Sequence, residues 1–488
     1  MERRQLGRSQ PLVEGLTLFF LFACTITAGA QPVVTGTISN VTRVESWRFF
    51  QPAIDPLALP APGTPPPGDP DYTFAGNRSE LGVRVEGSRF DFSAAFNYIR
   101  IEFLPRDAIG PGGLGSGAFY FAATSVPYSY QLYFGELTAR VKSSNGVSFT
   151  AGRMPFSSSG EARSGSLALQ NVKALRLQSR LIGNFEWSYY QRRFDGARFD
   201  VDRPHWHFNL SAFVPTQGGF EESANLSMPR IQVAASSFAL ESSNVEWQGF
   251  GYLYRDRRRQ AAVADNTGSF DRPVNITIGT VGGAYVRMLP RRTGEYDLVA
   301  WVAGQAGDWY GRSHRAASLA LEAGHKWTRA PLRPWLRGGY LWASGDGNGA
   351  DDRHGTFFPM LPSARKFALS TAYTQMNLKD AFAQLYFEPR GLRARIEVHA
   401  LHLARGADLW YAGSGATASN GRFFGFAGRA ARGETALGTV LEGTIDVPIR
   451  KHWSVNGYAG TMSAGAVVRG WFTNRRLAFW SIENVVRF

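Results

Sequence analysis

The sequence has almost no cysteine and, after its first thirty residues, no long hydrophobic run. The single cysteine among 488 residues is Cys24. Small exported scaffolds depend on disulfides, but a chain of this length does not. No later stretch approaches eighteen consecutive apolar residues, which excludes a protein anchored by transmembrane helices.

The first thirty residues have the outline of a secretory signal peptide. Three arginines stand within the first eight residues, and the apolar stretch 16–30 ends in the small residues Ala-Gly-Ala. A basic start, a short apolar core and a small-residue cleavage site define such peptides. We therefore predict a signal peptide over residues 1–30 and one domain over residues 31–488, which then contains no cysteine.

Acidic residues are scarce relative to basic ones. The chain has 53 Lys and Arg against 39 Asp and Glu, a net charge of +14 and a pI of about 10. A basic balance often indicates nucleic-acid binding, but export from the cytoplasm argues against such a partner. An anionic small molecule, an anionic polysaccharide or a lipid head group suits the arginine fork better.

Strand-like alternation is the main signal that is present. In LRARIEVHA (392–400) every second residue is apolar, and Arg393, Arg395, Glu397 and His399 occupy the other face. Successive side chains of a strand point to opposite faces, so one face is apolar and the other charged. The same alternation recurs at residues 80–86, 136–142, 380–388 and 441–447.

Two architectures produce this pattern. A surface-associated carbohydrate-binding β-sandwich or solenoid would bury the apolar face, whereas a membrane barrel turns it toward lipid around a wet lumen.

Counting strands back from Phe488, with the C-terminus placed in the periplasm, sorts the connections into short periplasmic turns and long external loops. Because rising and descending strands must alternate in this count, a further strand is required near 230–239. We predict an all-β transmembrane antiparallel barrel of about eighteen strands, in the bacterial outer membrane, with room for a water-filled lumen.

Charged residues on the polar faces are the candidate lumen site. Rings of Arg or Lys select anions in pores, so the sequence predicts a passive anion-selective channel. The alternative, that Arg–Glu pairs only stabilise a wet interior, stays open. The candidate side chains are Arg84, Arg140, Arg393, Arg395, Glu136, Glu397 and His399.

His399 is also the obvious base for an outer-membrane hydrolase with a serine on a neighbouring strand. The chain has no G-x-S-x-G or H-E-x-x-H motif, and such motifs would be needed to make catalysis specific. We predict that the protein is not an enzyme and needs no cofactor.

The stretch SGDGNGADD (344–352) is rich in oxygen ligands. Asp346, Asn348, Asp351 and Asp352 are weak candidates for a loop calcium site. The glutamate that closes an EF-hand loop is absent, so a solvated loop is the competing interpretation.

Two further segments suggest membrane partners. RDRRR (255–259) lies at the outer end of a predicted strand and fits either a solvated charge run or contact with phosphates of lipopolysaccharide. The chain ends AFWSIENVVRF, with apolar residues at alternate positions before Phe488. Such a terminal strand resembles the signal read by the outer-membrane insertion machinery.

Four segments, in order and spacing, resemble the alginate-export family of outer-membrane barrels. The resemblance implies eighteen strands and a passive conduit whose arginine-rich constriction attracts uronate carboxylates. Arg153 and Arg198 match motif positions and join the lumen candidates. Arg193 and Asp195 also match, but alternation places them on the face opposite Arg198 unless a bulge intervenes. The four segments are AGRMPF (151–156), YYQRRFDGARFD (189–200), SGDGNGADDRHGTFFPMLP (344–362) and ADLWYAGSGA (407–416).

Overall fold

The structure is a computed structural model that describes most of the chain after residue 30. The predicted signal peptide over residues 1–30 lies outside the described part, as does most of the proline-rich stretch 56–71. The described ranges are 31–53, 68–110, 112–259, 261–363, 372–389, 391–419 and 424–488.

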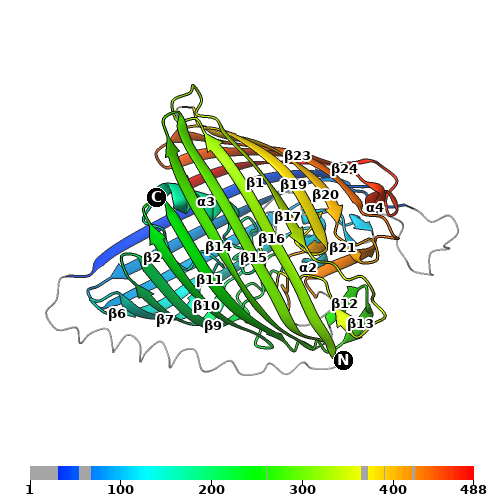
Figure 1. Cartoon of the computed structure of the whole chain (residues 1–488), viewed down its shortest axis with the longest axis horizontal. Helices are drawn as coiled ribbons and strands as arrows, with labels where there is room; N and C mark the ends of the chain where they lie inside the picture. The colour runs from blue at the N-terminus through cyan, green and yellow to red at the C-terminus, as the bar shows by residue number, and fades with distance from the viewer. Residues whose placement is uncertain are drawn as a thin grey trace.

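Eighteen antiparallel strands in the described ranges form one closed barrel (Figure 1). Closure comes from pairing of β1 (Val33–Arg48) with β25 (Arg476–Arg487), in a register running from Ser39 opposite Arg487 to Arg48 opposite Ala478. Joining the first strand to the last leaves no open sheet edge. The others are β2 (Asp71–Glu86), β3 (Phe90–Glu102), β6 (Ser129–Lys142), β7 (Val147–Met154), β8 (Phe194–Asp202), β9 (Trp206–Pro215), β10 (Ile231–Ser242), β11 (Val245–Asp256), β14 (Ile276–Arg291), β15 (Gly294–Trp309), β16 (Arg312–Lys326), β17 (Trp335–Ala343), β19 (Leu378–Phe387), β20 (Arg393–Leu403), β23 (Ala436–Arg450) and β24 (Trp453–Ala464).

The barrel confirms the predicted fold, and the sandwich or solenoid alternative is wrong. The strand that parity demanded near 230–239 is β10. One strand is much shorter than expected: the strand count back from Phe488 predicts a strand over 185–202, but β8 begins only at Phe194. Residues 185–193 leave the wall and turn into the barrel, as their contacts below demonstrate.

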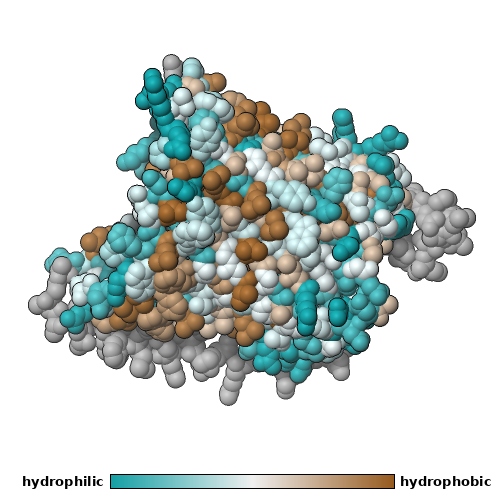
Figure 2. Space-filling view, viewed as in Figure 1, coloured by the Kyte–Doolittle hydropathy of each residue, from teal (hydrophilic) through white to brown (hydrophobic). Residues whose placement is uncertain are grey.

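The apolar faces of the strands point outward. On β20, Ile396 and Val398 are 53% and 40% exposed, whereas Glu397 and His399 are at most 1% exposed. Figure 2 shows apolar residues gathered across the strands, with hydrophilic residues at the two ends of the barrel. An apolar band between polar rims is the surface that a lipid bilayer requires, so the polar faces line the lumen.

A β-bulge in β6 keeps its apolar side chains pointing outward along the whole strand. The register with β3 shifts so that Ala95 faces Glu136 while Phe96 faces Phe134, which leaves Gly135 without an opposing residue. Leu132 and Phe134 point outward before the bulge, and Leu137 and Val141 do so after it. The extra residue exchanges the two faces, and this places the even-numbered residues from Glu136 onward in the lumen.

Connections are sorted by end, as predicted. One end has two-residue turns at 243–244, 292–293 and 451–452, and the other carries the long segments 155–193, 344–377 and 404–435. None of the helices in the described ranges is long and apolar enough to cross a membrane. The elements on the connections are β4 (Ile109–Gly110), β5 (Gly112–Gly113), α2 (Ser116–Thr124), α3 (Leu167–Arg176), β12 (Ala261–Asp265), β13 (Gly268–Arg272), β18 (Arg353–His354), β21 (Leu409–Gly413), β22 (Phe426–Ala430) and α4 (Ala466–Arg469).

Candidate functional site

The segment 155–193, between β7 and β8, crosses the lumen, and we call it the lumen segment. Its helix α3 is preceded by the N-cap residue Ser166, whose side chain accepts a hydrogen bond from Leu169 N. Lys173 of α3 forms an ion pair of 2.7 Å with Glu246, the second residue of β11 after the turn at 243–244. The helix therefore reaches the periplasmic half of the barrel wall.

A buried charge network fixes α3 against this wall. Glu322 of β16 accepts from Arg176 at 2.6 Å, from Arg180 at 3.1 Å and from Arg337 of β17 at 3.2 Å. Arg337 also pairs with Asp297 of β15 at 2.8 Å. All five side chains are at most 3% exposed. Acidic wall residues thus neutralise basic residues of the lumen segment, and the lumen has mixed charge.

Arg192 joins the lumen segment to the two other long connections. Its guanidinium donates to the carbonyl oxygens of Leu361 at 2.8 Å, Ser414 at 2.9 Å and Ala416 at 3.0 Å. The side chain is fully buried. One arginine therefore satisfies backbone oxygens of segments 344–377 and 404–435, and it packs all three segments into one body.

A cavity of about 340 Å³ remains on the opposite side of the lumen from α3, and we call it the lumen cavity. Arg43 lies at its wall, 3.0 Å from Glu483 and 3.4 Å from Glu45, with its guanidinium 4.6 Å from the centre of the Tyr189 ring. The cavity follows β1, β2 and β23 to β25 and is covered by residues 186–189. Its lining is Val41, Arg43, Arg78, Glu186, Trp187, Tyr189, Thr444, Asp446, Asn456, Gly457, Tyr458, Ser481, Glu483, Val485 and Arg487.

Arg78, which lines this cavity, and Arg193, the last residue of the lumen segment, are held by neutral oxygens. Arg78 donates to the carbonyl oxygens of Glu186 at 3.2 Å and Ser188 at 2.7 Å. Arg193 donates to the carbonyl of Gly135 at 2.9 Å and to Gln191 Oε1 at 2.6 Å. Carbonyl partners orient a guanidinium without cancelling its charge, so both keep a positive field toward the lumen.

Sequence reasoning did not select these two arginines. Arg78 occupies an inward position of β2, but its stretch lacks the clear alternation of residues 80–86. Arg193 matches a motif position, but it was set aside on the assumption that a strand continues through it. Because β8 begins at Phe194, Arg193 precedes the strand and its side chain does not follow the alternation of the strand.

The predicted lumen arginines of β6 and β8 do face inward, each with a local partner. Arg140 donates to Ser148 Oγ at 2.9 Å. Arg198 makes a two-pronged contact with Asp200, at 2.7 Å on each oxygen, and also donates to the carbonyl of Glu161 at 2.6 Å. Arg198 is thereby tied to its own strand and to the lumen segment.

The remaining inward arginines lie toward the periplasmic end. Arg84 is exposed and only 3.9 Å from Glu86. Arg393 is exposed at the first position of β20, opposite Asp446 of β23. Arg395 lies deeper and pairs with Glu397 at 3.0 Å. Of these three, Arg84 and Arg393 are the more accessible to a solute.

Arg153 is not a lumen residue in this structure, which corrects the prediction. It alternates with outward-facing Phe149 on β7, and its register partners are Leu137 and Asp195. Arg153 and Asp195 form a two-pronged ion pair with both distances at 2.7 Å, and Ser227 donates to the same carboxylate. Partners opposite one another in a sheet share a face, so this pair lies on the outer side of the barrel.

The predicted acidic residues and His399 do lie inside. Glu136 is half-buried on the lumen face of β6. Glu397 and His399 are fully buried on β20, and His399 Nδ1 lies 2.9 Å from Asp380. Among the described contacts, this aspartate and not a serine is the hydrogen-bond partner of His399.

The candidate calcium ligands shape their own loop. Asp346 Oδ1 accepts from Asn348 N at 3.3 Å, Asn348 Oδ1 from Ala350 N at 3.2 Å, and Asp351 Oδ1 from Arg353 N at 2.9 Å. Such side-chain contacts two residues onward build Asx turns. The loop calcium site stays a prediction.

RDRRR (255–259) is divided between the two sides of the wall. Arg258 is buried and pairs with Asp256 at 2.9 Å, and Arg257 donates to the carbonyl of Ile276 at 2.7 Å. Arg255 and Arg259 are exposed. Contact with lipopolysaccharide stays a prediction, for which Arg255 and Arg259 are the exposed candidates.

The closed barrel, apolar outer band and sorted connections define an outer-membrane β-barrel of the porin class. A model of the family described as "Alginate export" matches residues 153–473. The chain belongs to the alginate-export family. No curated protein sequence matches it.

Similar solved structures share the fold at low sequence identity. Pseudomonas aeruginosa OccK2 (OpdF) in complex with glucuronate has a TM-score of 0.54 at 9% identity, covering 93% of this chain and 98% of that one. P. aeruginosa OpdK with vanillate has 0.52 at 8%, with 93% and 98% covered. Acinetobacter baumannii OccAB1 has 0.54 at 8%, with 93% and 96% covered.

Proposed function

We propose that this protein is a passive outer-membrane channel for small anionic solutes, with uronate-like saccharides as the substrate class. The observation that carries the proposal is the lumen cavity, which lies inside a lipid-facing barrel and is bordered by Arg43, Arg78 and Arg487. Family membership and the barrel fold favour a channel over an enzyme. The glucuronate bound by OccK2 gives a carboxylate-bearing sugar as a precedent among similar folds.

Weak, repeated contacts are the proposed mechanism of passage. A solute carboxylate exchanges water for a guanidinium fork, and the exchange must be favourable enough for entry yet weak enough for release. Asp446 and Glu483 on the same wall offset part of the positive charge of these arginines, so a bound anion can still be released. Arg393, exposed at the periplasmic start of β20, supplies a further contact at the mouth.

Ion selectivity in planar bilayers tests this proposal. In a KCl gradient, the wild-type reversal potential should show anion preference, and Arg78→Ala combined with Arg487→Ala should reduce the anion-to-cation permeability ratio severalfold. Glucuronate should compete with chloride in the wild type and less in the double variant. Arg100→Ala is the matched control, since Arg100 is 61% exposed and pairs with Glu102 at 2.8 Å. Cation preference in the wild type contradicts the proposal.

A further inference from the structure

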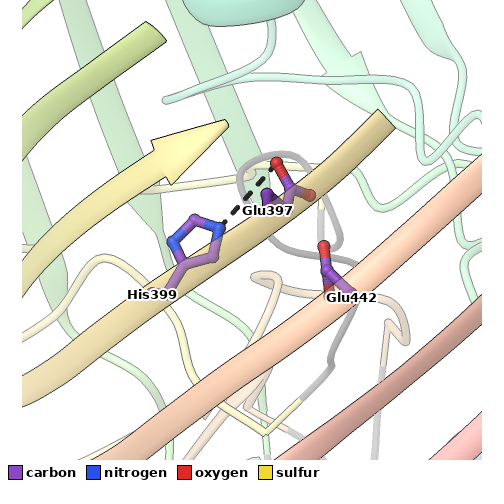
Figure 3. Close-up of side chains that lie close together, drawn as sticks. All are labelled: Glu397, His399 and Glu442. Atoms are coloured by element: carbon purple, nitrogen blue, oxygen red, sulfur yellow. Dashed lines mark ion pairs between the residues drawn. The ribbon is translucent and has the colours of Figure 1, made fainter. Parts of the chain in front are cut away.

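Three side chains from neighbouring strands form a compact buried group on the lumen wall, and we call it the wall cluster. Glu397 and His399 come from β20, and Glu442 comes from β23 (Figure 3). None is more than 2% exposed, and their nearest ligand atoms all lie within 4.8 Å of one another. Among the described residues, no other three acidic, histidine or cysteine side chains come this close together.

His399 is oriented as metal-binding histidines are. Its Nδ1 faces both carboxylate oxygens of Asp380, at 2.9 and 3.0 Å. A carboxylate in this position holds the proton on Nδ1, so Nε2 is the nitrogen that faces away from Asp380 and that a metal ion would bind, with release of any proton carried there. Histidine ligands of metals commonly use their second nitrogen in this way.

Nε2 of His399 is buried and has no hydrogen-bond partner. Glu397 Oε2 lies 3.9 Å away, beyond hydrogen-bonding range. Leaving a buried polar atom unpaired costs about 1–3 kcal/mol, so such an atom calls for a ligand. This nitrogen is directed into the wall cluster.

The two carboxylates of the wall cluster also contact polar neighbours. Glu397 accepts from Gln384 on Oε2 and lies 3.0 Å from Arg395 on Oε1. Glu442 accepts from the Tyr458 hydroxyl at 2.9 Å. A carboxylate has two oxygens and roughly four lone-pair positions, so such contacts are compatible with binding of a metal ion.

Charge also favours a cation. Asp380, Glu397 and Glu442 present three carboxylates, of which Glu397 pairs with Arg395 and Asp380 with His399. The nearby lumen-segment guanidinium groups of Arg176 and Arg180 are engaged by Glu322. A dication beside a neutral His399 therefore balances the group.

We propose that the wall cluster binds one divalent transition-metal ion of the zinc type. His399 Nε2, Glu397 and Glu442 are the ligands, and Asp380 is the positioning residue. Zinc bonds of about 2.0–2.1 Å in a tetrahedron put ligand atoms about 3.4 Å apart, which rotation of the two glutamate side chains provides. One imidazole with two carboxylates suits zinc better than magnesium or calcium. Three protein ligands leave the fourth position for water.

Metal binding by the full-length barrel in detergent tests the site. After stripping with a chelator and dialysis against Zn²⁺, the wild type should retain one zinc per chain more than His399→Asn, and Glu442→Gln should weaken binding at least tenfold. Asp380→Asn should weaken it by about tenfold or more, the usual effect of removing the carboxylate behind a ligating histidine. His207→Asn is the matched control, because His207 is also a lumen-wall histidine held by Asp202, at 2.6 Å.

A measurement on the unmodified protein covers the case in which a variant fails to fold. X-ray absorption at the zinc edge should show a first shell of nitrogen and oxygen with one imidazole. Several imidazoles, an all-oxygen shell, or equal zinc retention by wild type and His399→Asn would overturn the proposal. The result does not depend on channel activity, so a failure of the proposed function would leave the metal test unaffected.

Discussion

At the residue scale, the lumen depends on a few buried arginines that bind backbone rather than carboxylates. Arg192 illustrates this, because its two terminal nitrogens donate to carbonyl oxygens of the connections 344–377 and 404–435. A planar guanidinium presents five donors in a rigid fork, whereas a lysine ammonium has three donors on a flexible stem. A side chain that no local sequence pattern singles out therefore helps to pack the long connections together, beside backbone contacts such as that of Gly183 N with Leu361 O.

Replacing this arginine should loosen the connections. Arg192→Met leaves the carbonyls of Ser414 and Ala416 without this donor, at about 1–3 kcal/mol for each buried group. The carbonyl of Leu361 loses one of its two donors and keeps Gly183 N. Hydrogen exchange of residues 357–363 should accelerate at least tenfold, and single-channel conductance should become noisier. Arg163→Met is the control, since Arg163 is an exposed arginine of the same segment. Unchanged exchange in Arg192→Met would show that the carbonyls find other partners.

At the element scale, α3 is held by the Glu322 network, so this glutamate controls the position of the lumen segment. Glu322→Gln leaves buried guanidinium groups of Arg176, Arg180 and Arg337 with too little negative charge. Breaking a buried ion pair by removing one partner costs about 3–5 kcal/mol. We expect α3 to detach and the mean single-channel conductance to rise.

Glu388→Gln provides the comparison for this variant. Glu388 pairs with Lys326 at 2.6 Å, but both side chains are about a quarter or more exposed, at 36% and 26%. Such pairs contribute about 0–1 kcal/mol, so conductance and thermal stability should stay near wild type. Equal effects of the two substitutions would contradict the assignment of Glu322 as the anchor of α3.

The external connection 404–435 should respond to pH through Asp408. This buried carboxylate accepts from Asp346 N at 2.8 Å, Thr356 at 2.6 Å and Tyr411 at 2.7 Å. Burial raises its pKa to about 6, although these hydrogen bonds oppose the shift. Between about pH 4 and 6 the folded loop keeps a proton that the unfolded loop releases, so its stability falls as pH rises.

Hydrogen exchange of residues 344–363, corrected for the intrinsic pH dependence, measures this effect. Protection should decrease between pH 4 and 6 by an amount equivalent to about 3 kcal/mol at most, from two pKa units at about 1.4 kcal/mol each. Asp408→Asn should flatten the profile because its side chain does not titrate. Protection that rises with pH in the wild type would show that hydrogen bonding outweighs burial.

At the scale of the whole molecule, the C-terminal strand closes the barrel. Phe488 N donates to Ile38 O at 2.8 Å and Ile38 N donates to Phe488 O at 3.1 Å. Trp480, Ile482 and Phe488 are exposed on the lipid side, as the alternation predicted. The Phe488 ring also stacks on His452, with ring centres 4.8 Å apart.

Phe488→Ala should lower the yield of assembled barrel severalfold. The backbone pairing with Ile38 survives, but the terminal aromatic group predicted to be read by the insertion machinery is lost. The measurement is the amount of heat-modifiable protein in outer-membrane fractions. Phe149→Ala, which removes another lipid-facing phenylalanine that is 49% exposed, should assemble normally. Equal yields of the two variants would show that the terminal position has no special role.

The sequence by itself determined the number of strands, their lipid-facing sides and the end at which long connections lie. Alternation has a period of two residues and is therefore local, and a barrel wall must contain an even number of antiparallel strands when both chain ends lie on one side. The strand β10 could be inferred from that count. The inward positions of Arg84, Arg140, Arg393 and Arg395 follow from the same rule.

Only the tertiary structure decided which charges stay available in the lumen. Segment 155–193 has no periodicity that marks it as interior, yet its arginines neutralise Glu322 on a strand far along the chain. Arg153 faces outward because its strand register pairs it with Asp195, whereas Arg78 and Arg193 keep their charge beside carbonyl oxygens. Whether a charge is cancelled depends on partners brought together by folding, and such partners leave no local pattern in the sequence.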